Sequence, residues 1–239
     1  MGEVSVAHRG SLRVAALAAG GLAATYLLLG IVALAFLLPL EQTSSAGSGA
    51  LDSLAENGTG WWLTARWLFL LSSLLGLGLV VGLRPLAPPG REALAEWAAA
   101  VGGLGFVVVA VDQVRLISHV PGLVAAAAAS PDRAREISNL SIVNLTDRYD
   151  LLTFGALGLW LLVTSLACLP QAAPRWLTAG GVLAAIIFLT VAAFEEAWTS
   201  VVAGVGAITV APVFFGGLAV LAPRWSQDQT ENSAADRHA

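Results

Sequence analysis

Residues 61–83, WWLTARWLFLLSSLLGLGLVVGL, form an apolar stretch that contains one charged residue, Arg66. A helix needs about 20 such residues to cross a hydrocarbon core of about 30 Å. A helix also bonds every backbone polar group internally, as a lipid environment requires. The stretch therefore predicts a membrane-spanning helix, in which Arg66 lies roughly 7 Å below Trp61.

Five further stretches of similar length and character occur along the chain. Hydrophobic residues make up 57% of the sequence and charged residues only 12%, with a mean hydropathy of +0.78, whereas soluble domains carry about 25% charged residues. The 239 residues contain no linker long enough to separate two domains. We therefore expect an all-α polytopic membrane protein, with a six-helix bundle in residues 1–225 and a polar cytoplasmic tail in residues 226–239. The predicted spans are 14–38, 61–83, 95–119, 151–169, 176–194 and 201–221.

The arginines predict the orientation of these spans. If the amino terminus is cytoplasmic, seven arginines outside the spans fall on the cytoplasmic side and three on the other side. Cytoplasmic loops carry the excess of basic residues. We therefore expect a multi-pass protein of the cell membrane with both termini in the cytoplasm. The first span is longer than the apolar region of a signal peptide, so we expect it to be retained. Arginine supplies all twelve basic residues and Ala and Gly are abundant, which is typical of a bacterial coding sequence rich in G and C.

The longest connection, residues 120–150, falls on the extracytoplasmic side. Residues 120–129 are apolar but too few to cross a membrane, so they are expected to lie in the interface or to re-enter. Ser130 and Pro131 resemble an N-cap followed by proline at the first helical position. We expect a short amphipathic helix over residues 131–142 that lies over the outer end of the bundle and can act as a lid.

Ionisable residues gather at the extracytoplasmic ends of the spans, in a set that we call the outer layer. Asp112, Arg115 and His119 are spaced by three and four residues, which puts them on one stripe of a helix. A charge is costly at membrane depth, so such residues usually face a bundle interior and mark a functional site. The predicted ligand-binding residues are Arg66, Asp112, Arg115, His119, Arg148, Asp150, Glu195 and Glu196.

Each member of the outer layer also has a purely structural interpretation. Asp112 and Arg115 can neutralise one another on one helix face, and His119 can bond a carbonyl at a helix end. Arg66 can extend its guanidinium to the lipid headgroups. Helix capping or solvation in a turn accounts equally well for the other carboxylates, Asp150, Glu195 and Glu196.

The outer layer permits acid and base chemistry without specifying a reaction. Carboxylates in a pocket of low dielectric constant and a histidine can exchange protons near neutral pH, so Asp112, His119 and Glu195 are the candidate catalytic residues. The spacing is not specific for a metal, and no cofactor motif is present, so neither a metal nor a cofactor is predicted. Cys168 is the one cysteine, which excludes an intramolecular disulfide, and a net charge of -4 provides no basic surface for nucleic acid.

Small residues and prolines suggest how the helices pack. Glycines at Gly78 and Gly82 and within 102–105 predict close helix contacts, and Pro212 predicts a kink in the last span.

Pro174, Arg175, Trp176 and Leu177 open the predicted fifth span after a short cytoplasmic turn. With the order of the spans and the long connection between the third and fourth, they make the chain resemble an uncharacterised group of bacterial six-helix membrane proteins, catalogued as a domain of unknown function. The resemblance implies a six-helix bundle and supplies no catalytic residues.

Three functions fit these features. The first is a protein whose extracytoplasmic pocket binds a small or amphiphilic ligand. The second is an accessory subunit that packs against another membrane protein or a second copy of itself. The third is a membrane-embedded enzyme that acts on a lipid-like substrate. The almost uncharged cytoplasmic halves of the spans argue against a pathway across the membrane.

Overall fold

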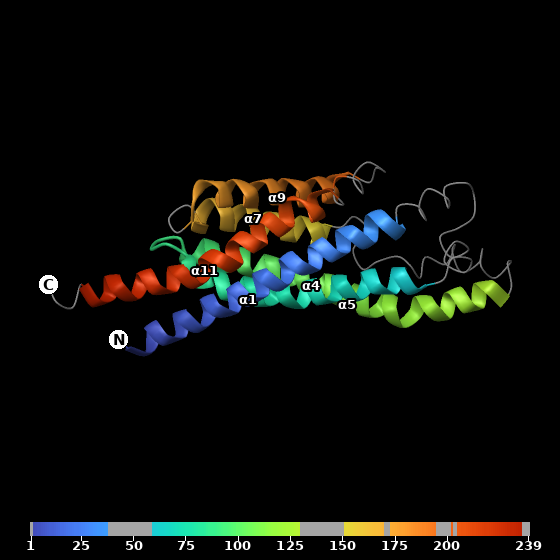
Figure 1. Cartoon of the computed structure of the whole chain (residues 1–239), viewed down its shortest axis with the longest axis horizontal. Helices are drawn as coiled ribbons and strands as arrows, with labels where there is room; N and C mark the ends of the chain where they lie inside the picture. Colours follow the sequence, from blue (N-terminus) through green and yellow to red (C-terminus); the bar gives the residue numbers. More distant parts are fainter. Residues whose placement is uncertain are drawn as a thin grey trace.

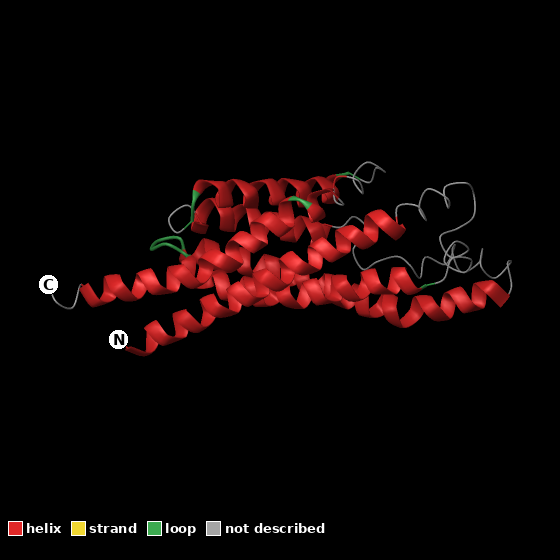
Figure 2. Ribbon diagram, viewed as in Figure 1, coloured by secondary structure: helices red, strands yellow, loops and turns green. Residues whose placement is uncertain are grey.

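A computed structural model of the chain describes residues 2–37, 59–129, 151–169, 173–194, 202 and 205–235. The described residues form helices and no strands (Figures 1 and 2). The six main helices are α1 (Gly2–Val32), α4 (Gly60–Leu83), α5 (Glu92–Ala129), α7 (Ala156–Val163), α9 (Arg175–Ala193) and α11 (Val210–Ala235). Shorter π-helical or 3-10 segments extend them at η1 (Ala33–Leu37), η2 (Arg84–Leu86), η3 (Leu151–Gly155) and η4 (Thr164–Cys168).

Six helices are long and apolar enough to cross a membrane, which confirms the predicted fold class. Their apolar windows deviate by only a few residues from the predicted spans, except in the third, which is longer. The windows are Gly10–Ala35, Gly60–Leu86, Glu92–Ala126, Leu151–Cys168, Arg175–Ala193 and Val205–Trp225.

The helices pack in a ring that follows their order along the chain. Each main helix contacts the next one, and α11 closes the ring against both α1 and α9. Because six spans return the chain to its starting side, the two termini lie at the same end of the bundle (Figure 1). We call this the terminal end, and the opposite end, where α4 begins, the loop end.

The third span is the main correction to the sequence prediction. Residues 120–129 were expected to leave the membrane-spanning helix, but α5 continues through Pro121 to Ala129 without a break. Proline removes one hydrogen bond, to the carbonyl of Ile117, and packing can compensate for that loss. Leu116, Val120 and Val124 recur at four-residue spacing and form a buried cluster with Trp62. The end of α5 consequently extends past the other described helices at the loop end (Figure 1).

Three further expectations concern the polar tail, the last span and the outer connection. Residues 226–235, expected to belong to a polar tail, continue α11 as a helix. A turn at Thr209 interrupts the last span three residues before Pro212, consistent with the predicted kink. The amphipathic helix predicted over residues 131–142 lies outside the described residues.

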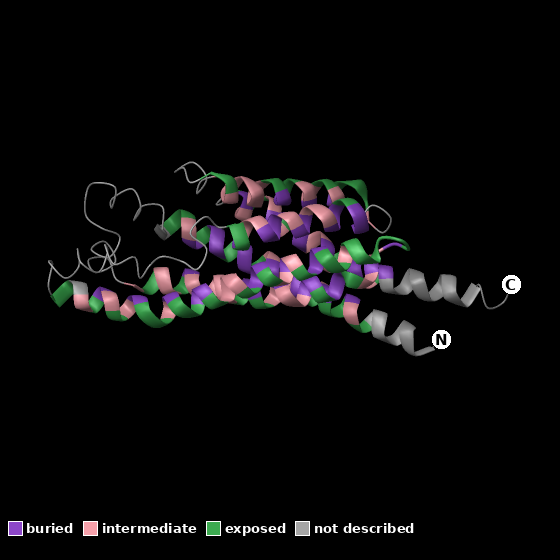
Figure 3. Ribbon diagram, turned by 180° about the vertical axis from the view of Figure 1, so that it is seen from behind, coloured by how far each residue is buried: buried purple, intermediate pink, exposed green. Residues whose placement is uncertain are grey.

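Glycines set the closest helix contacts, as predicted for most of them. A Cβ added to Gly82 would lie 2.6 Å from the backbone nitrogen of Ala15 on α1, and one on Gly105 would lie 3.1 Å from the Cβ of Ala156 on α7. Gly103 differs, because an added Cβ there would meet nothing within 4 Å. Buried residues line the inside of the ring, and large apolar side chains lie exposed on its outside, where a bilayer would cover them (Figure 3).

Candidate functional site

Asp112 lies buried inside the bundle. Only 3% of its surface is exposed, and it is the one charged residue among those that the structure describes as buried. Asp112 follows Gly105 by seven residues, so both lie on one face of α5, within about 20°. That face packs against η3 and the start of α7, since an added Cβ on Gly105 would lie 3.3 Å from the carbonyl oxygen of Leu152. Asp112 thus lies on the same face as Gly105, about 10 Å nearer the loop end.

Gln113, the next residue, is a buried polar group that the sequence reasoning missed. It is 7% exposed, and its Oε1 is buried and accepts no hydrogen bond within the described part of the chain. Gln113 follows Phe106 by seven residues, and the Phe106 ring lies against Gly76 of α4. A buried acceptor without a donor costs about 1–3 kcal/mol. One signal in the sequence could have revealed Gln113. Its polar side chain lies on the same face of the helix as Phe106, where the other side chains are apolar.

Arg66 approaches the same depth from α4. The two helices are antiparallel, with Arg84 bonded to Glu96, Gly76 against Phe106 and Trp62 packed with Leu116 and Val120. This register puts Arg66 opposite residues 114–116 of α5. Asp112 then lies two to four residues deeper, or about 3–6 Å at 1.5 Å per residue.

The guanidinium of Arg66 stacks over an aromatic ring of its own helix. Its Cζ lies 4.8 Å from the centre of the Trp62 ring, which is within the range of a cation–π interaction. Arg66 is half-buried. Trp62 thus stabilises the guanidinium charge at this depth. This interaction replaces part of the electrostatic stabilisation that lipid headgroups would otherwise provide.

Arg115 and His119 are exposed, although their spacing puts them on the stripe of Asp112. The His119 ring contacts the carbonyl oxygen of Arg115, with 2.9 Å between Nδ1 and the oxygen. The sequence predicted that His119 could bond a carbonyl oxygen at the end of a helix. Because α5 continues past His119, the contact forms within an unbroken helix. Burial therefore divides the predicted stripe into an inner carboxylate and two outer basic residues.

The other half of the outer layer lies outside the described residues, namely Arg148, Asp150, Glu195 and Glu196. Of the three candidate catalytic residues, Asp112 and His119 can be compared. Seven residues separate them along α5, a rise of about 10 Å, and one is buried while the other is exposed. Within the described ranges, no three His, Cys, Asp or Glu side chains come close enough to hold a metal ion.

The terminal end carries a second group of charged side chains that the sequence reasoning treated only as a short connection. Arg84 Nη2 donates to Glu96 Oε1 over 2.9 Å, and Glu92 Oε2 accepts from the backbone nitrogen of Gly90 over 2.8 Å. A hollow of about 280 Å³ lies beside the pair, lined by Arg84, Pro85, Ala87, Glu92, Ala95 and Glu96. These contacts account for both carboxylates locally, and they fix the turn between α4 and α5.

A family model described as a domain of unknown function, DUF4386, matches residues 18–222. The chain belongs to the DUF4386 family. The match runs from the first span to the last, so the described residues of the DUF4386 outer layer all fall within it. Neither the curated proteins nor the solved structures contain a match. The family match agrees with a six-helix membrane protein, and the family description states no function.

Proposed function

We propose that this DUF4386 protein binds a small or amphiphilic ligand in a polar pocket at the loop end of its membrane-spanning bundle. The observation that carries the proposal is the pair of adjacent buried polar side chains, Asp112 and Gln113, in a span that is otherwise apolar toward the interior. Burying polar groups in a membrane is costly, and Gln113 Oε1 accepts no hydrogen bond within the described residues, so a bound ligand that donates to it offsets part of the cost.

The chemistry of the residues indicates what the ligand offers. Asp112 and Gln113 Oε1 are acceptors, so the ligand carries a hydroxyl or amino group that donates to them. Arg66, at nearly the same depth, adds a positive charge that favours an acidic or strongly polar group beside the donor. Arg148, Asp150, Glu195 and Glu196 belong to the proposed pocket on the sequence prediction alone.

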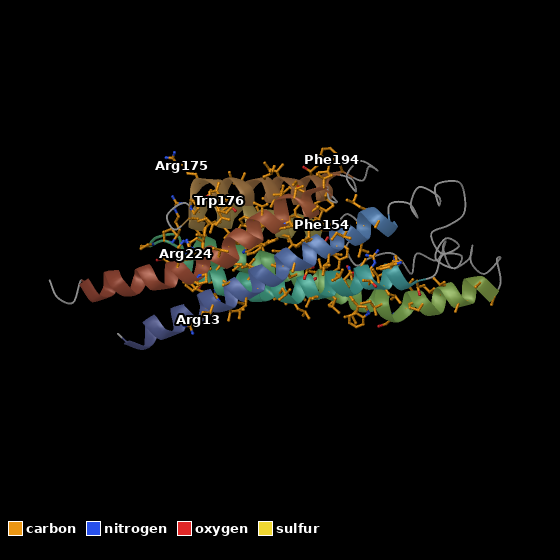
Figure 4. The ribbon with its side chains drawn as sticks, in the orientation of Figure 1. Arg13, Phe154, Arg175, Trp176, Phe194 and Arg224 are labelled. Carbon is orange, nitrogen blue, oxygen red and sulfur yellow. The ribbon has the colours of Figure 1, made fainter. Side chains whose placement is uncertain are left out.

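The distribution of arginines supports an extracytoplasmic position for this pocket. Figure 4 shows Arg13, Arg175 and Arg224 near the terminal end and Phe194 at the opposite end. Arg84 and Arg91 lie at the terminal end too, since they follow α4. With Arg9, which precedes Arg13 in α1, six described arginines thus lie there and two, Arg66 and Arg115, toward the loop end. The positive-inside rule then favours cytoplasmic termini in the cell membrane, with the loop end outside.

The burial pattern also favours a pocket that opens on one side. Toward the terminal end, the buried polar residues of the described spans are the uncharged Ser72, Ser73, Thr164 and Ser165. Ser72 and Ser73 bond the carbonyl oxygen of Phe69 in their own helix. A polar path across the membrane would need groups that face a common channel, and these serines do not provide one.

The test is to identify small molecules that co-purify with the full-length protein in mild detergent. Mass spectrometry of the extracted material would be compared for the wild type, Asp112→Asn, Gln113→Leu and, as a control at the other end of α5, Glu96→Gln. We expect a non-phospholipid species retained in near-stoichiometric amount by the wild type and E96Q. It should be reduced about tenfold in D112N and Q113L, because the loss of one hydrogen bond, about 1–1.5 kcal/mol, weakens binding by roughly that factor. Equal retention by all four proteins, or no species above a mock purification, would refute the pocket.

A further inference from the structure

Two buried hydroxyl groups face each other toward the terminal end, on η4 and α9. Ser165 of η4 is fully buried, with none of its surface exposed. Its Oγ and the Oγ1 of Thr178 in α9 are both shielded from solvent, and neither makes a hydrogen bond within the described part of the chain. The pair lies in the opposite half of the bundle from Asp112 and Gln113, so it is separate from the proposed pocket.

A close contact between η4 and α9 fixes where the Ser165 hydroxyl lies. A Cβ added to Gly181 would overlap Ser165 Oγ, so this oxygen occupies the space that a side chain at position 181 would need. Thr178 precedes Gly181 by three residues, and Cβ positions three apart on a helix are about 5–6 Å from each other. The two hydroxyl oxygens are therefore roughly 5–6 Å apart, which is too far for a direct hydrogen bond.

The direction of Thr178 follows from a second contact of α9. A Cβ added to Gly158 of α7 would lie 2.7 Å from Cγ of Leu189, so the Leu189 side of α9 packs against α7. Thr178 lies eleven residues before Leu189, which brings it back to the same face of the helix within about 20°. Thr178 therefore faces α7 and its extension η4, where Ser165 lies.

The usual acceptor for the Thr178 hydroxyl is already occupied. Serine and threonine in a helix commonly donate to the carbonyl four residues earlier, as Ser73 donates to the carbonyl oxygen of Phe69 over 2.8 Å. The carbonyl four residues before Thr178 belongs to Pro174, and it already accepts from the backbone nitrogens of Leu177 and Thr178. The first turn of α9 thus directs the Thr178 hydroxyl away from its own helix.

The Ser165 hydroxyl is in a similar position, because it lies in a π-helical turn. The carbonyl of Leu161, four residues before Ser165, accepts from the backbone nitrogen of Thr164, where η4 begins. A π-helical turn shifts its backbone bonds to partners five residues apart. In membrane-spanning helices, ordered waters satisfy polar groups at such irregular turns. Both hydroxyls therefore require a partner from outside their own helices.

We propose that Ser165 and Thr178 bind one ordered water molecule, which bridges η4 and α9 inside the membrane-spanning bundle. Two hydrogen bonds of about 2.8 Å each span up to roughly 5.6 Å, which matches the separation of the two oxygens. Each hydroxyl can donate or accept, so both fit a water that donates to one and accepts from the other. A buried hydroxyl without a partner is costly, and the water removes this cost at both residues. The bridge holds the π-helical end of the fourth span against the start of the fifth.

The test is a double-mutant cycle on the thermal unfolding of the full-length protein in one detergent. Ser165→Ala and Thr178→Val should each lower the midpoint by about 2–4 °C, because each leaves the other hydroxyl without its bridge. The double variant should unfold no lower than the less stable single variant, since the second substitution removes a group that has already lost its partner. Ser73→Ala is the matched control, because Ser73 is equally buried and bonds its own helix. Its effect should add to that of T178V.

Three results would overturn the water bridge. A midpoint that rises in S165A and T178V would show that the hydroxyls have no partner, and effects that add in the double variant would show that each hydroxyl bonds separately. A midpoint that rises when sodium chloride replaces choline chloride, and only while both hydroxyls are present, would assign the site to a cation. If S165A fails to fold, T178V is compared with Thr178→Ser, which keeps the hydroxyl. A lower midpoint for T178V then supports the bridge, and an equal or higher one rejects it.

Discussion

Replacing Gly82 by alanine should loosen the contact between α1 and α4. The added Cβ would lie 2.6 Å from the nitrogen, 2.7 Å from the Cβ and 2.8 Å from the Cα of Ala15. Carbon contacts are favourable at about 3.5–4.0 Å, so the two helices would have to separate by about 1 Å. Two of the three neighbouring atoms belong to the backbone, so a change of side-chain rotamer cannot relieve the clash. Overpacking of this kind costs about 1–3 kcal/mol.

Gly103→Ala is the matched control for this change. Gly103 lies inside a span as Gly82 does, but an added Cβ there meets nothing within 4 Å. Both substitutions gain the same intrinsic helix propensity, about 1 kcal/mol in water, so the difference between the variants isolates the clash. Thermal unfolding in one detergent should give a midpoint lower for G82A than for G103A by roughly 5 °C, if about 2–4 °C corresponds to 1 kcal/mol. A G82A protein that unfolds at or above the midpoint of G103A would show that α1 and α4 do not pack through Gly82.

Three further predictions concern other parts of the bundle. Glu96→Gln should lower the free energy of unfolding by less than about 1 kcal/mol, because the ion pair of Arg84 and Glu96 is half-exposed and exposed pairs contribute little. A larger loss of stability in chemical denaturation would contradict this expectation. Pro121→Ala restores an N–H at residue 121 that can bond the carbonyl of Ile117. Amide hydrogen exchange in the turn that this bond closes should therefore slow. Unchanged or faster exchange would argue against a continuous α5. Cys168 in η4 is buried, so a membrane-permeant maleimide should label the folded protein slowly and the denatured protein fully. Rapid labelling of the folded form would contradict the packing of η4.

Much of the architecture was predictable because the bilayer imposes a length on its helices. A stretch such as 151–169 has to bond its backbone polar groups internally and match the hydrocarbon thickness, whatever its neighbours are. The first, second, fourth, fifth and sixth spans therefore agree with the structure to within a few residues. Pro121 and the shortness of residues 120–129 indicated a helix end, but the packing of Val120 and Val124 with Trp62 keeps α5 continuous.

The candidate site was predictable only in part. Helical periodicity aligned Asp112, Arg115 and His119, and it was correct about their common stripe. It did not show that Asp112 is buried while Arg115 and His119 remain exposed, because burial depends on the neighbouring helices. Gln113 was missed for a related reason, since its position on the face of Phe106 is significant only once that face is known to be buried.

The sequence alone determined the class of this protein, the number of its spans and the approximate bounds of five of them. These follow from local quantities, since apolar length and a rise of about 1.5 Å per residue need no knowledge of neighbours. Tertiary structure alone decided the ring order, the continuation of α5 and, among the described residues of its outer part, the burial of Asp112 beside the exposed Arg115 and His119. Burial arises from contacts between segments far apart in the chain, such as Gly105 with Leu152 and Phe106 with Gly76, and no pattern within one helix contains them.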